Sequence, residues 1–297
     1  MIIIQAQSVV YNNNKSSLEL TIESIDNAVR VARDYYKLDV KLELHYGDAG
    51  ELRTFTEEDL CRLNNQYKNI SIMYKFFGEN TGSARGHNIL SEGCKSDYIL
   101  IMNPDVKLSP HFFFYILEPF KETNVGMVEA RQTPIEHQKQ YDIVTLQTEW
   151  ATTACAIIRK DLFERLNGFD SDSFFLYCDD VDFSWRLRLL GYVIIYQPLA
   201  PVYHPKKLDK QGKWIPTKAE IYYSAESSLL MAYKWSNGER LKYLIDVFAN
   251  SNDEVLLSVV KSFNERKKNN RLPSPIDADH KIAKFVGDYY SENRFIL

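Results

Sequence analysis

The sequence predicts an α/β domain with a largely parallel sheet, followed by a helical extension. Apolar runs typical of buried strands alternate with helical stretches four times before residue 121, which is the pattern of βα units. From about Thr217 onward the pattern is helical, with short breaks. We therefore assign residues 1–205 to the α/β domain and residues 206–297 to a C-terminal helical extension.

The first half contains four expected strands with helices between them. The first helix has the clearest pattern, because Leu18, Ile22, Ile25 and Val29 form one apolar stripe. Ser109 predicts the start of a fourth helix, since a serine N-cap followed by proline is a favourable beginning. The expected strands are residues 2–7, 41–46, 70–76 and 98–102, and the other expected helices are residues 18–36, 57–67 and 83–92.

The second half is more mixed. Two prolines in residues 269–275 indicate a linker between the last two helices. Strands are expected at residues 125–132, 154–160 and 193–196, and helices at residues 181–190, 219–235, 239–249, 254–267 and 276–290.

The composition excludes several classes of protein. The formal net charge is −4, so no broad basic field indicates a nucleic-acid partner. No apolar run approaches the roughly 20 residues that cross a bilayer, and residues 1–11 lack the basic start and cleavage site of a signal peptide. We expect a cytoplasmic protein, soluble or peripheral. The irregular spacing of the four cysteines fits a reduced compartment; they are Cys61, Cys94, Cys155 and Cys178.

Polar side chains follow three of the expected strands. Ligands of parallel sheets bind beyond the carboxyl ends of the strands. The loops there hold Tyr11, Asp48 and the motif Asn103-Pro104-Asp105. A carboxylate just past a buried strand is the hard oxygen ligand that a divalent ion bridging a diphosphate prefers. The alternative for this motif is an Asx-Pro turn that closes the strand.

A second candidate is the acidic run that follows an apolar stretch at residues 174–177. Asp179 and Asp180 would lie at the N-terminus of a helix, where the helix dipole favours negative charge. Asp182 and Arg186 form an i,i+4 pair on that helix. Acids emerging from a buried segment suit a general base. The alternative is helix capping with a surface ion pair.

Two isolated residues are further candidates. His204 follows a strand-like run and could bind a metal, although a single histidine is more often structural. Trp150 precedes the strand expected at 154–160, and its face suits stacking on an acceptor sugar. Core packing is the alternative for this tryptophan.

The order of four sequence blocks resembles family 2 glycosyltransferases, especially their bacterial rhamnosyltransferase-like branch. The blocks are NTGSARGHN, DYILIMNPDV, GFDSDSFFLYCDDVDFSWRLRLLGY and VYH, and the resemblance covers roughly residues 1–205. It implies a GT-A fold with a Rossmann-like sheet, a nucleotide-diphosphate sugar donor, a divalent metal (Mn²⁺ or Mg²⁺) and inversion at the anomeric carbon.

The resemblance also implies roles for single residues. Asp105 matches the metal ligand of an Asp-any-Asp motif whose first acid is here Asn103, a neutral and weaker ligand. His204 matches a histidine that completes the metal site in related members. Asp180 matches the catalytic base, and Asp179 replaces the usual glutamate before it. The donor pocket would include Asp48, Asn80, Arg85, Asn88 and Arg186, and the acceptor side would include Asp179 and Trp185. Their positions beside expected strands add Tyr11 to the donor side and Trp150 to the acceptor side.

The expected substrates are a UDP- or dTDP-linked sugar and a glycan or lipid-linked glycan acceptor, in cell-surface polysaccharide synthesis. Basic runs at Lys206-Lys207, Lys261 and 266–268 are either a solvated face or a peripheral contact with anionic membrane. The extension could also form a homodimer surface. The alternative functions are a nucleotidyltransferase and a non-catalytic binding module. The first needs a glycine-rich loop that Tyr11–Lys15 lacks, and the second would not need Asp105 and Asp180.

Overall fold

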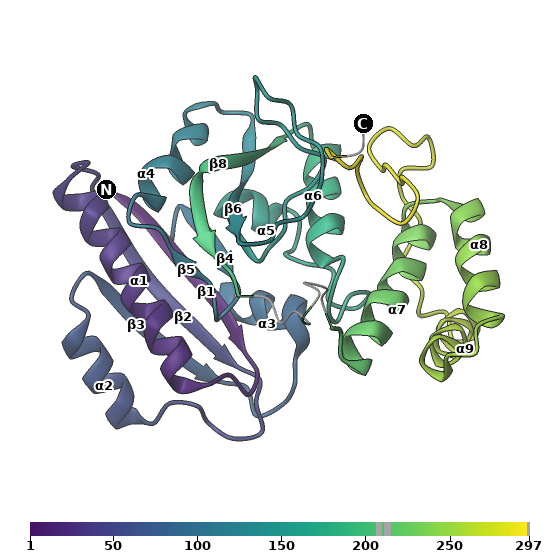
Figure 1. Cartoon of the computed structure of the whole chain (residues 1–297), viewed down its shortest axis with the longest axis horizontal. Coiled ribbons are helices and arrows are strands. Elements are labelled where there is room, and N and C mark those ends of the chain that lie inside the picture. The colour runs from purple at the N-terminus through teal and green to yellow at the C-terminus, as the bar shows by residue number, and fades with distance from the viewer. Residues whose placement is uncertain (206–209, 211–214, 296–297) are drawn as a thin grey trace.

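The protein is built on an eight-stranded mixed sheet with helices on both faces (Figure 1). The computed structural model describes residues 1–205, 210 and 215–295. Within these residues the strand order is β3-β2-β1-β4-β7-β6-β8-β5. The strands are β1 Ile2–Val10, β2 Val40–Asp48, β3 Ile70–Phe76, β4 Tyr98–Met102, β5 Lys107–Leu108, β6 Val125–Thr133, β7 Cys155–Arg159 and β8 Val193–Tyr203.

Most of the sheet runs in one direction. Strands β1 to β4 are mutually parallel where they pair, and β6 is parallel to β8. The β7 strand is antiparallel to both β4 and β6. The start of β7 therefore meets the carboxyl ends of β4 and β6 at one edge. The expected largely parallel sheet is confirmed, and this edge holds most of the candidate side chains.

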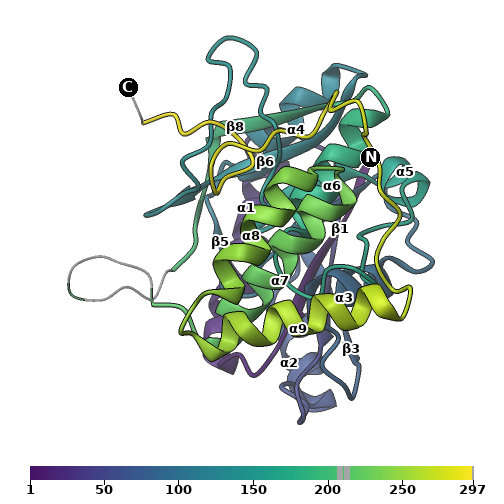
Figure 2. The ribbon, with the colours of Figure 1, turned by 90° about the vertical axis from the view of Figure 1, so that its right-hand side faces the viewer.

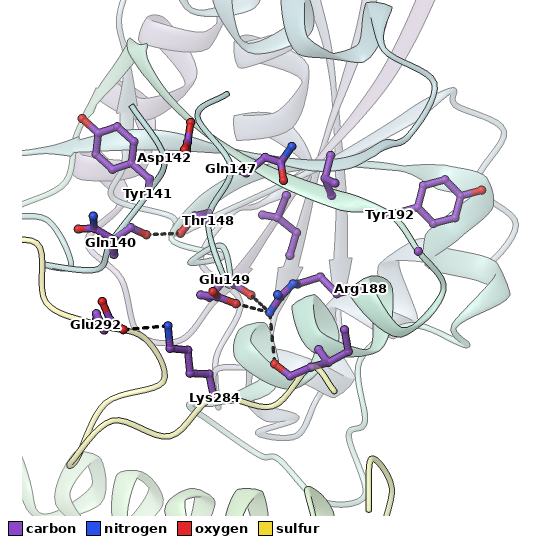
Figure 3. A pocket seen from close by; sticks show the side chains of 14 residues that line it. Gln140, Tyr141, Asp142, Gln147, Thr148, Glu149, Arg188, Tyr192, Lys284 and Glu292 are labelled. Carbon is purple, nitrogen blue, oxygen red and sulfur yellow. Dashed lines mark hydrogen bonds and ion pairs between the residues drawn. The ribbon is translucent and has the colours of Figure 1, made fainter. Parts of the chain in front are cut away.

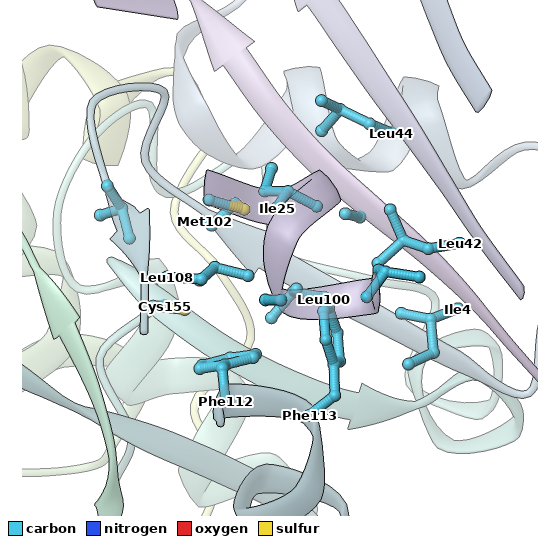
Figure 4. Packing of buried hydrophobic residues seen from close by; sticks show 14 of the residues in the cluster. Ile4, Ile25, Leu42, Leu44, Leu100, Met102, Leu108, Phe112, Phe113 and Cys155 are labelled. Carbon is cyan, nitrogen blue, oxygen red and sulfur yellow. The ribbon is translucent and has the colours of Figure 1, made fainter. Parts of the chain in front are cut away.

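The two faces of the sheet bury two different sets of side chains, because successive residues of a strand point to opposite sides. In β4, Leu100 and Met102 join the core on one face, while Ile99 and Ile101 join the core on the other. Figure 4 shows the first of these cores. It is covered by α1 Lys15–Asp34, α2 Glu57–Gln66 and α4 Phe112–Leu117, and the other face by α3 Gly82–Ser91, α5 Lys160–Arg165 and α6 Asp179–Leu189.

Helix α6 joins the sheet to the C-terminal helices. Its Phe183 and Leu187 pack against the sheet, while Val181 and Trp185 belong to a third core. Figures 1 and 2 show the C-terminal helices beside α6, at one end of the molecule. They are α7 Lys218–Lys234, α8 Gly238–Ala249 and α9 Glu254–Lys268, which confirms three of the four helices expected in the extension.

Two expectations about helices were wrong. Residues 276–290 are irregular, because the Asp277 carboxylate accepts the backbone N–H groups of Lys281, Ile282 and Ala283 and so closes a local loop. Both Asp277 and Gly287 also have a left-handed backbone. Helix α4 begins at Phe112, with His111 at its N-cap, so Ser109 does not cap it.

Several properties of the chain follow from the described residues. All four cysteines are free. Among the helices the structure describes, none combines the length and the apolar character that crossing a bilayer requires. The expected basic run at Lys206-Lys207 lies outside the described residues. Lys261 and residues 266–268 lie on α9.

Candidate active site

Three polar side chains converge where β4 and β8 end. Asn103 and Asp105 follow β4 directly, and His204 follows β8. The His204 Nε2 atom lies 3.7 Å from Asp105 Oδ1 and 3.2 Å from Asn103 Nδ2. These residues are about a hundred positions apart in the chain, and the parallel strands bring them to one point. The residues that resemble the metal motif therefore lie close together in the structure.

Gln132, near the end of β6, orients this histidine. Its Oε1 atom lies 2.7 Å from His204 Nδ1, and both side chains are buried. With the proton on Nδ1, the imidazole donates to Gln132 and turns the lone pair of Nε2 toward Asp105 and Asn103. A hydrogen bond of this kind, to the second ring nitrogen, is typical of metal-binding histidines.

The donor set at this point fits a divalent ion that a diphosphate also binds. Asp105 is about a third exposed and supplies a carboxylate oxygen, and His204 supplies an imidazole nitrogen. Both suit Mn²⁺. In the part of the chain that the structure describes, no group of three or more His, Cys, Asp and Glu residues could hold a metal. Two protein ligands leave positions for phosphate oxygens and water, as in many magnesium sites.

Asp180 stands at the first turn of α6, as expected. Its carboxylate accepts the backbone N–H of Val181 at 2.8 Å and a backbone hydrogen bond from Thr153. Burial raises the pKa of this carboxyl group, while these hydrogen bonds and the charge of Lys139 oppose the rise. A carboxylate that holds a proton more readily than usual is suited to accept one from a hydroxyl group.

The short segment before β7 connects the two halves of the site. The Ala154 carbonyl accepts the backbone N–H of Asn103 at 2.9 Å, and the preceding residue, Thr153, donates to Asp180. The metal motif and the candidate base are therefore hydrogen-bonded to neighbouring residues of one segment. The structure places Asn103, Asp105 and His204 together, and this segment links Asp180 to them.

The N-terminus of α3 borders the same region. Gly82 has a left-handed backbone with φ +66°, and a Cβ atom there would collide with the Phe175 carbonyl oxygen. That carbonyl accepts the Ser83 N–H at 3.0 Å, and the Ser83 side chain bonds to Asp179. The start of α3 is thus held against the segment that precedes α6.

The residues predicted for the donor side differ in exposure and in their contacts. Tyr11 is half-exposed at the end of β1. Asn80 is exposed, and its Oδ1 accepts the Gly82 N–H. Arg85 is about half exposed and pairs with Glu79 at 2.8 Å. All three predicted residues remain open to a ligand and stay predictions.

Asp48 and Asn88 instead act within the fold. Asp48 is fully buried, and its carboxylate accepts hydrogen bonds from the N–H groups of Gly50 and Thr54 and from the Tyr74 hydroxyl. The side-chain amide of Asn88 both donates to the Phe169 carbonyl and accepts the Phe169 N–H. The structure therefore places both side chains in support of loops rather than on an open donor surface.

The remaining predictions for donor and acceptor contacts need correction. Arg186 donates to Asp182 at 2.7 Å and to two backbone carbonyls, so its guanidinium is used within the protein. Trp185 is fully buried among aromatic rings. Trp150 is 8% exposed and has the Lys139 ammonium 4.0 Å from its ring centroid. Asp179 is buried as well. The structure therefore does not support a contact of Asp179 with the acceptor or stacking of an acceptor sugar on Trp150 or Trp185.

Two further residues beside Asp180 were missed in the sequence. Glu129 of β6 and Lys139 of the following loop form a buried ion pair. Burial raises the pKa of Glu129 to about 7, and Asp180 adds to this rise. The available signal was a glutamate in the otherwise apolar first half of β6, Val125–Thr133. The partner could not be found, because Lys139 lies in a loop with no regular pattern.

A cavity of about 470 Å³ lies elsewhere (Figure 3). It is bounded by the loop around Gln147, the end of α6 and the C-terminal segment. Two ion pairs line it, Arg188 with Glu149 at 2.5 Å and Lys284 with Glu292 at 3.0 Å. None of the predicted site residues contributes to its wall.

The sequence matches two curated rhamnosyltransferases over part of its length. No family model matches the chain. It is 31% identical over 91 residues to N-acetylglucosaminyl-diphospho-decaprenol L-rhamnosyltransferase of Mycobacterium tuberculosis, which is 31% of this chain and 27% of the relative. It is 29% identical over 86 residues to rhamnosyltransferase WbbL of Escherichia coli, which is 29% of this chain and 31% of the relative. The matches thus span about a quarter to a third of the relatives.

Solved structures share the fold over most of the chain. Mannosyltransferase PcManGT from Pyrobaculum calidifontis, solved with GDP-Man and Mn²⁺, gives a TM-score of 0.55 at 15% identity and covers 88% of this chain and 79% of its own. GalNAc-T7, solved with UDP, GalNAc and Mn²⁺, gives a TM-score of 0.62 at 11% identity and covers 92% of this chain and 56% of its own. The fold is that of the GT-A glycosyltransferases. This fold and the partial sequence matches to rhamnosyltransferases agree with the resemblance to family 2 glycosyltransferases seen in the sequence.

Proposed function

We propose that this chain is an inverting glycosyltransferase that transfers a sugar from a nucleotide diphosphate to a hydroxyl group of a glycan or lipid-linked glycan. One observation carries the proposal. The Asp105–His204 pair and the Asp180 carboxylate are joined through residues 153 and 154 at the carboxyl edge of the sheet. A leaving diphosphate and an attacking hydroxyl need such groups at one place.

The chemistry is a single displacement. Asp180 accepts the proton of the acceptor hydroxyl as the acceptor oxygen forms its bond to the anomeric carbon. The bond between that carbon and the diphosphate oxygen breaks, and its electron pair leaves with the nucleoside diphosphate. The raised pKa of the Asp180 carboxyl group helps it to hold the proton that it receives.

Asp105 and His204 would hold the divalent ion, with Asn103 beside them. When bound, such an ion neutralises negative charge that develops on the diphosphate. Gln132 holds the His204 ring so that Nε2 faces Asp105. Because Asn103 is neutral, the site has one carboxylate fewer than the motif it resembles, and we expect a modest affinity for the metal.

The names of the partial relatives guide the substrate class. Both are rhamnosyltransferases, and one is named for a diphospho-decaprenol acceptor. We therefore propose a dTDP- or UDP-linked donor and a lipid-linked glycan acceptor in cell-surface polysaccharide synthesis. Such an acceptor would place the reaction at the cytoplasmic face of a membrane, and the basic residues of α9 would suit that surface.

The test combines donor binding with turnover. A thermal-shift screen of UDP-, dTDP- and GDP-sugars, with Mn²⁺ or with chelator, identifies the donor, and release of nucleoside diphosphate from that donor reports turnover. We expect Asp180→Asn to reduce turnover by about 10²–10⁴-fold and to leave the donor-induced thermal shift intact. We expect Asp105→Ala to remove the part of that shift that depends on Mn²⁺.

Asp172→Asn is the matched control, because Asp172 is an exposed carboxylate on the segment that leads to α6. It should behave like the wild type in both assays. Full turnover in Asp180→Asn would exclude this residue as the base. A donor shift in Asp105→Ala that equals the wild type with and without chelator would exclude the metal role. Donor binding without any turnover in the wild type would favour a binding module.

A further inference from the structure

A buried ion pair lies next to the candidate base. The ammonium of Lys139 contacts the carboxylate of Glu129, and both side chains are at most 5% exposed. Moving two charges out of water carries a large desolvation cost, and a packed apolar pair of similar volume is often at least as stable. Stability alone is therefore a weak reason for placing these charges here.

The backbone before β7 ties this pair to Asp180. Glu129 accepts a backbone hydrogen bond from Thr152, and Asp180 accepts one from Thr153. Consecutive residues of one segment thus bond to the two carboxylates, and the charge of Asp180 raises the pKa of Glu129. The charge of Lys139 acts on both carboxylates, lowering the pKa of Glu129 and of Asp180 against the effect of burial.

Lys139 has little freedom to leave this position. Its ammonium lies 4.0 Å from the centroid of the Trp150 ring. Its backbone pairs with Asn293 of the C-terminal segment in an antiparallel bridge. The next residue of that segment, Arg294, forms an ion pair with Glu136. The C-terminal segment thereby fixes the loop that carries Lys139, and the helical extension contributes to the site through this contact.

The charges around Asp180 are mostly negative or neutral. Asp179 and Cys178 precede it on its own segment, Glu129 faces it from β6, and Tyr290 faces it from the C-terminal segment. His137 packs against Trp150, and the positive charge of Arg294 lowers the pKa of Lys139. The positive charge of Lys139 opposes the effect of burial on the Asp180 and Glu129 carboxylates.

We propose that Lys139 is a positioning residue that keeps the Asp180 carboxylate charged and ready to accept a proton, and that Glu129 sets the strength of this effect by sharing the same ammonium. This inference rests on the proposed function, because it assigns Asp180 as the base. It predicts opposite effects from the two partners. Removing Lys139 takes the cation away from both carboxylates, whereas neutralising Glu129 gives Asp180 a larger share of the ammonium.

The experiment measures turnover against pH for Lys139→Met, Lys139→Arg, Glu129→Gln and the Lys139→Met/Glu129→Gln double variant. An opposite charge within a few ångströms lowers the pKa of an acid by about 1 to 3. On the acidic limb we therefore expect Lys139→Met to lose about tenfold or more of its turnover, with the limb moved to higher pH. Glu129→Gln should move the limb to lower pH, and the double variant should lie between the two. Lys139→Arg should retain most of the wild-type profile.

A second measurement needs no substrate. The ¹³C chemical shift of the Asp180 carboxyl group, followed by NMR between pH 3 and 9, should show the same two opposite displacements. If Lys139→Met does not fold, the shift in Glu129→Gln alone tests the proposal, since this variant keeps the side-chain shape and removes one charge. A purely structural ion pair would change the melting temperature and leave the position of the acidic limb and the titration of Asp180 unchanged.

The outcomes separate the two levels of inference. If Asp180→Asn abolishes turnover but neither single variant moves the Asp180 titration, the role of Lys139 is refuted and the proposed function stands. If both variants move the titration while Asp180→Asn keeps full turnover, the electrostatic coupling is real and the assignment of the base is refuted. If Lys139→Met and Glu129→Gln move the Asp180 titration in the same direction, the proposal that the two carboxylates share the Lys139 ammonium is also refuted.

Discussion

A substitution can distinguish two roles for Arg186, which was expected in the donor pocket but which the structure shows paired with a buried carboxylate. Its guanidinium donates to Asp182 at 2.7 Å and to the carbonyls of Leu166 and Gly168 at 2.8 and 2.9 Å. Asp182 is fully buried and also binds Lys234 at 2.7 Å and the Trp235 indole N–H at 3.1 Å. Arg186 therefore joins α6 to the loop before it by neutralising a buried charge.

We expect Arg186→Met to destabilise the protein by about 3–5 kcal/mol, because breaking a buried ion pair leaves a buried charge with less compensation. Lys234 cannot replace the lost cation fully, since it also pairs with Asp170 at 2.6 Å. At about 2 °C per kcal/mol for a chain of this size, the melting temperature should fall by about 6–10 °C. Calorimetry or thermal unfolding followed by circular dichroism measures this directly.

Arg62→Met is the matched control. Arg62 is 46% exposed on the side chain and pairs with Glu19 at the surface, where such pairs contribute about 0–1 kcal/mol. A control loss within that range shows that removing an arginine is not itself destabilising. If Arg186→Met unfolds like the wild type and instead weakens donor binding, the structural role of Arg186 is refuted, and Arg186 would belong to the donor pocket as the resemblance implied.

Two further predictions concern the start of α3 and the acid before the base. Gly82→Ala should lower the free energy of unfolding by more than the about 1–3 kcal/mol of a strained left-handed residue, because its Cβ would also meet the Phe175 carbonyl. Gly93 has a similar φ and open space around it, so Gly93→Ala should lose only the backbone contribution. Equal losses of the two variants in chemical denaturation would refute the collision. Burial and the Asp180 charge raise the pKa of Asp179 in the folded state, so its contribution to stability is complete below its unfolded pKa and is lost as pH rises through the folded pKa. Asp179→Asn should therefore match the stability of the wild type near pH 4. At pH 8 it should be more stable than the wild type by about 1.4 kcal/mol for each pH unit that separates the folded and unfolded pKa values of Asp179. A stability difference that does not grow with pH would contradict this.

Local patterns were sufficient for most of the α/β framework. The apolar stripe that includes Leu18 and Ile22 predicted α1, and the four strands expected before residue 121 all occur. The helix expected at residues 276–290 does not form, because side-chain capping by Asp277 competes with helical hydrogen bonds. This competition depends on contacts that a pattern of apolar residues does not record.

The candidate site was predicted in part. Asp105 and His204 meet as the resemblance implied, and Asp180 begins α6. The chemistry of a side chain does not reveal its direction, however. Trp150 and Trp185 have faces that suit a sugar, yet both are buried.

The sequence alone determined where the strands end and which polar residues follow them, because strand periodicity and strand length are local properties. Asn103-Pro104-Asp105 after β4 is the clearest case. Only the tertiary structure decided which of these polar groups remain available to a ligand. A buried charge such as Glu129 needs a partner, and the fold supplied Lys139 from a loop that no local pattern linked to this strand or to the site.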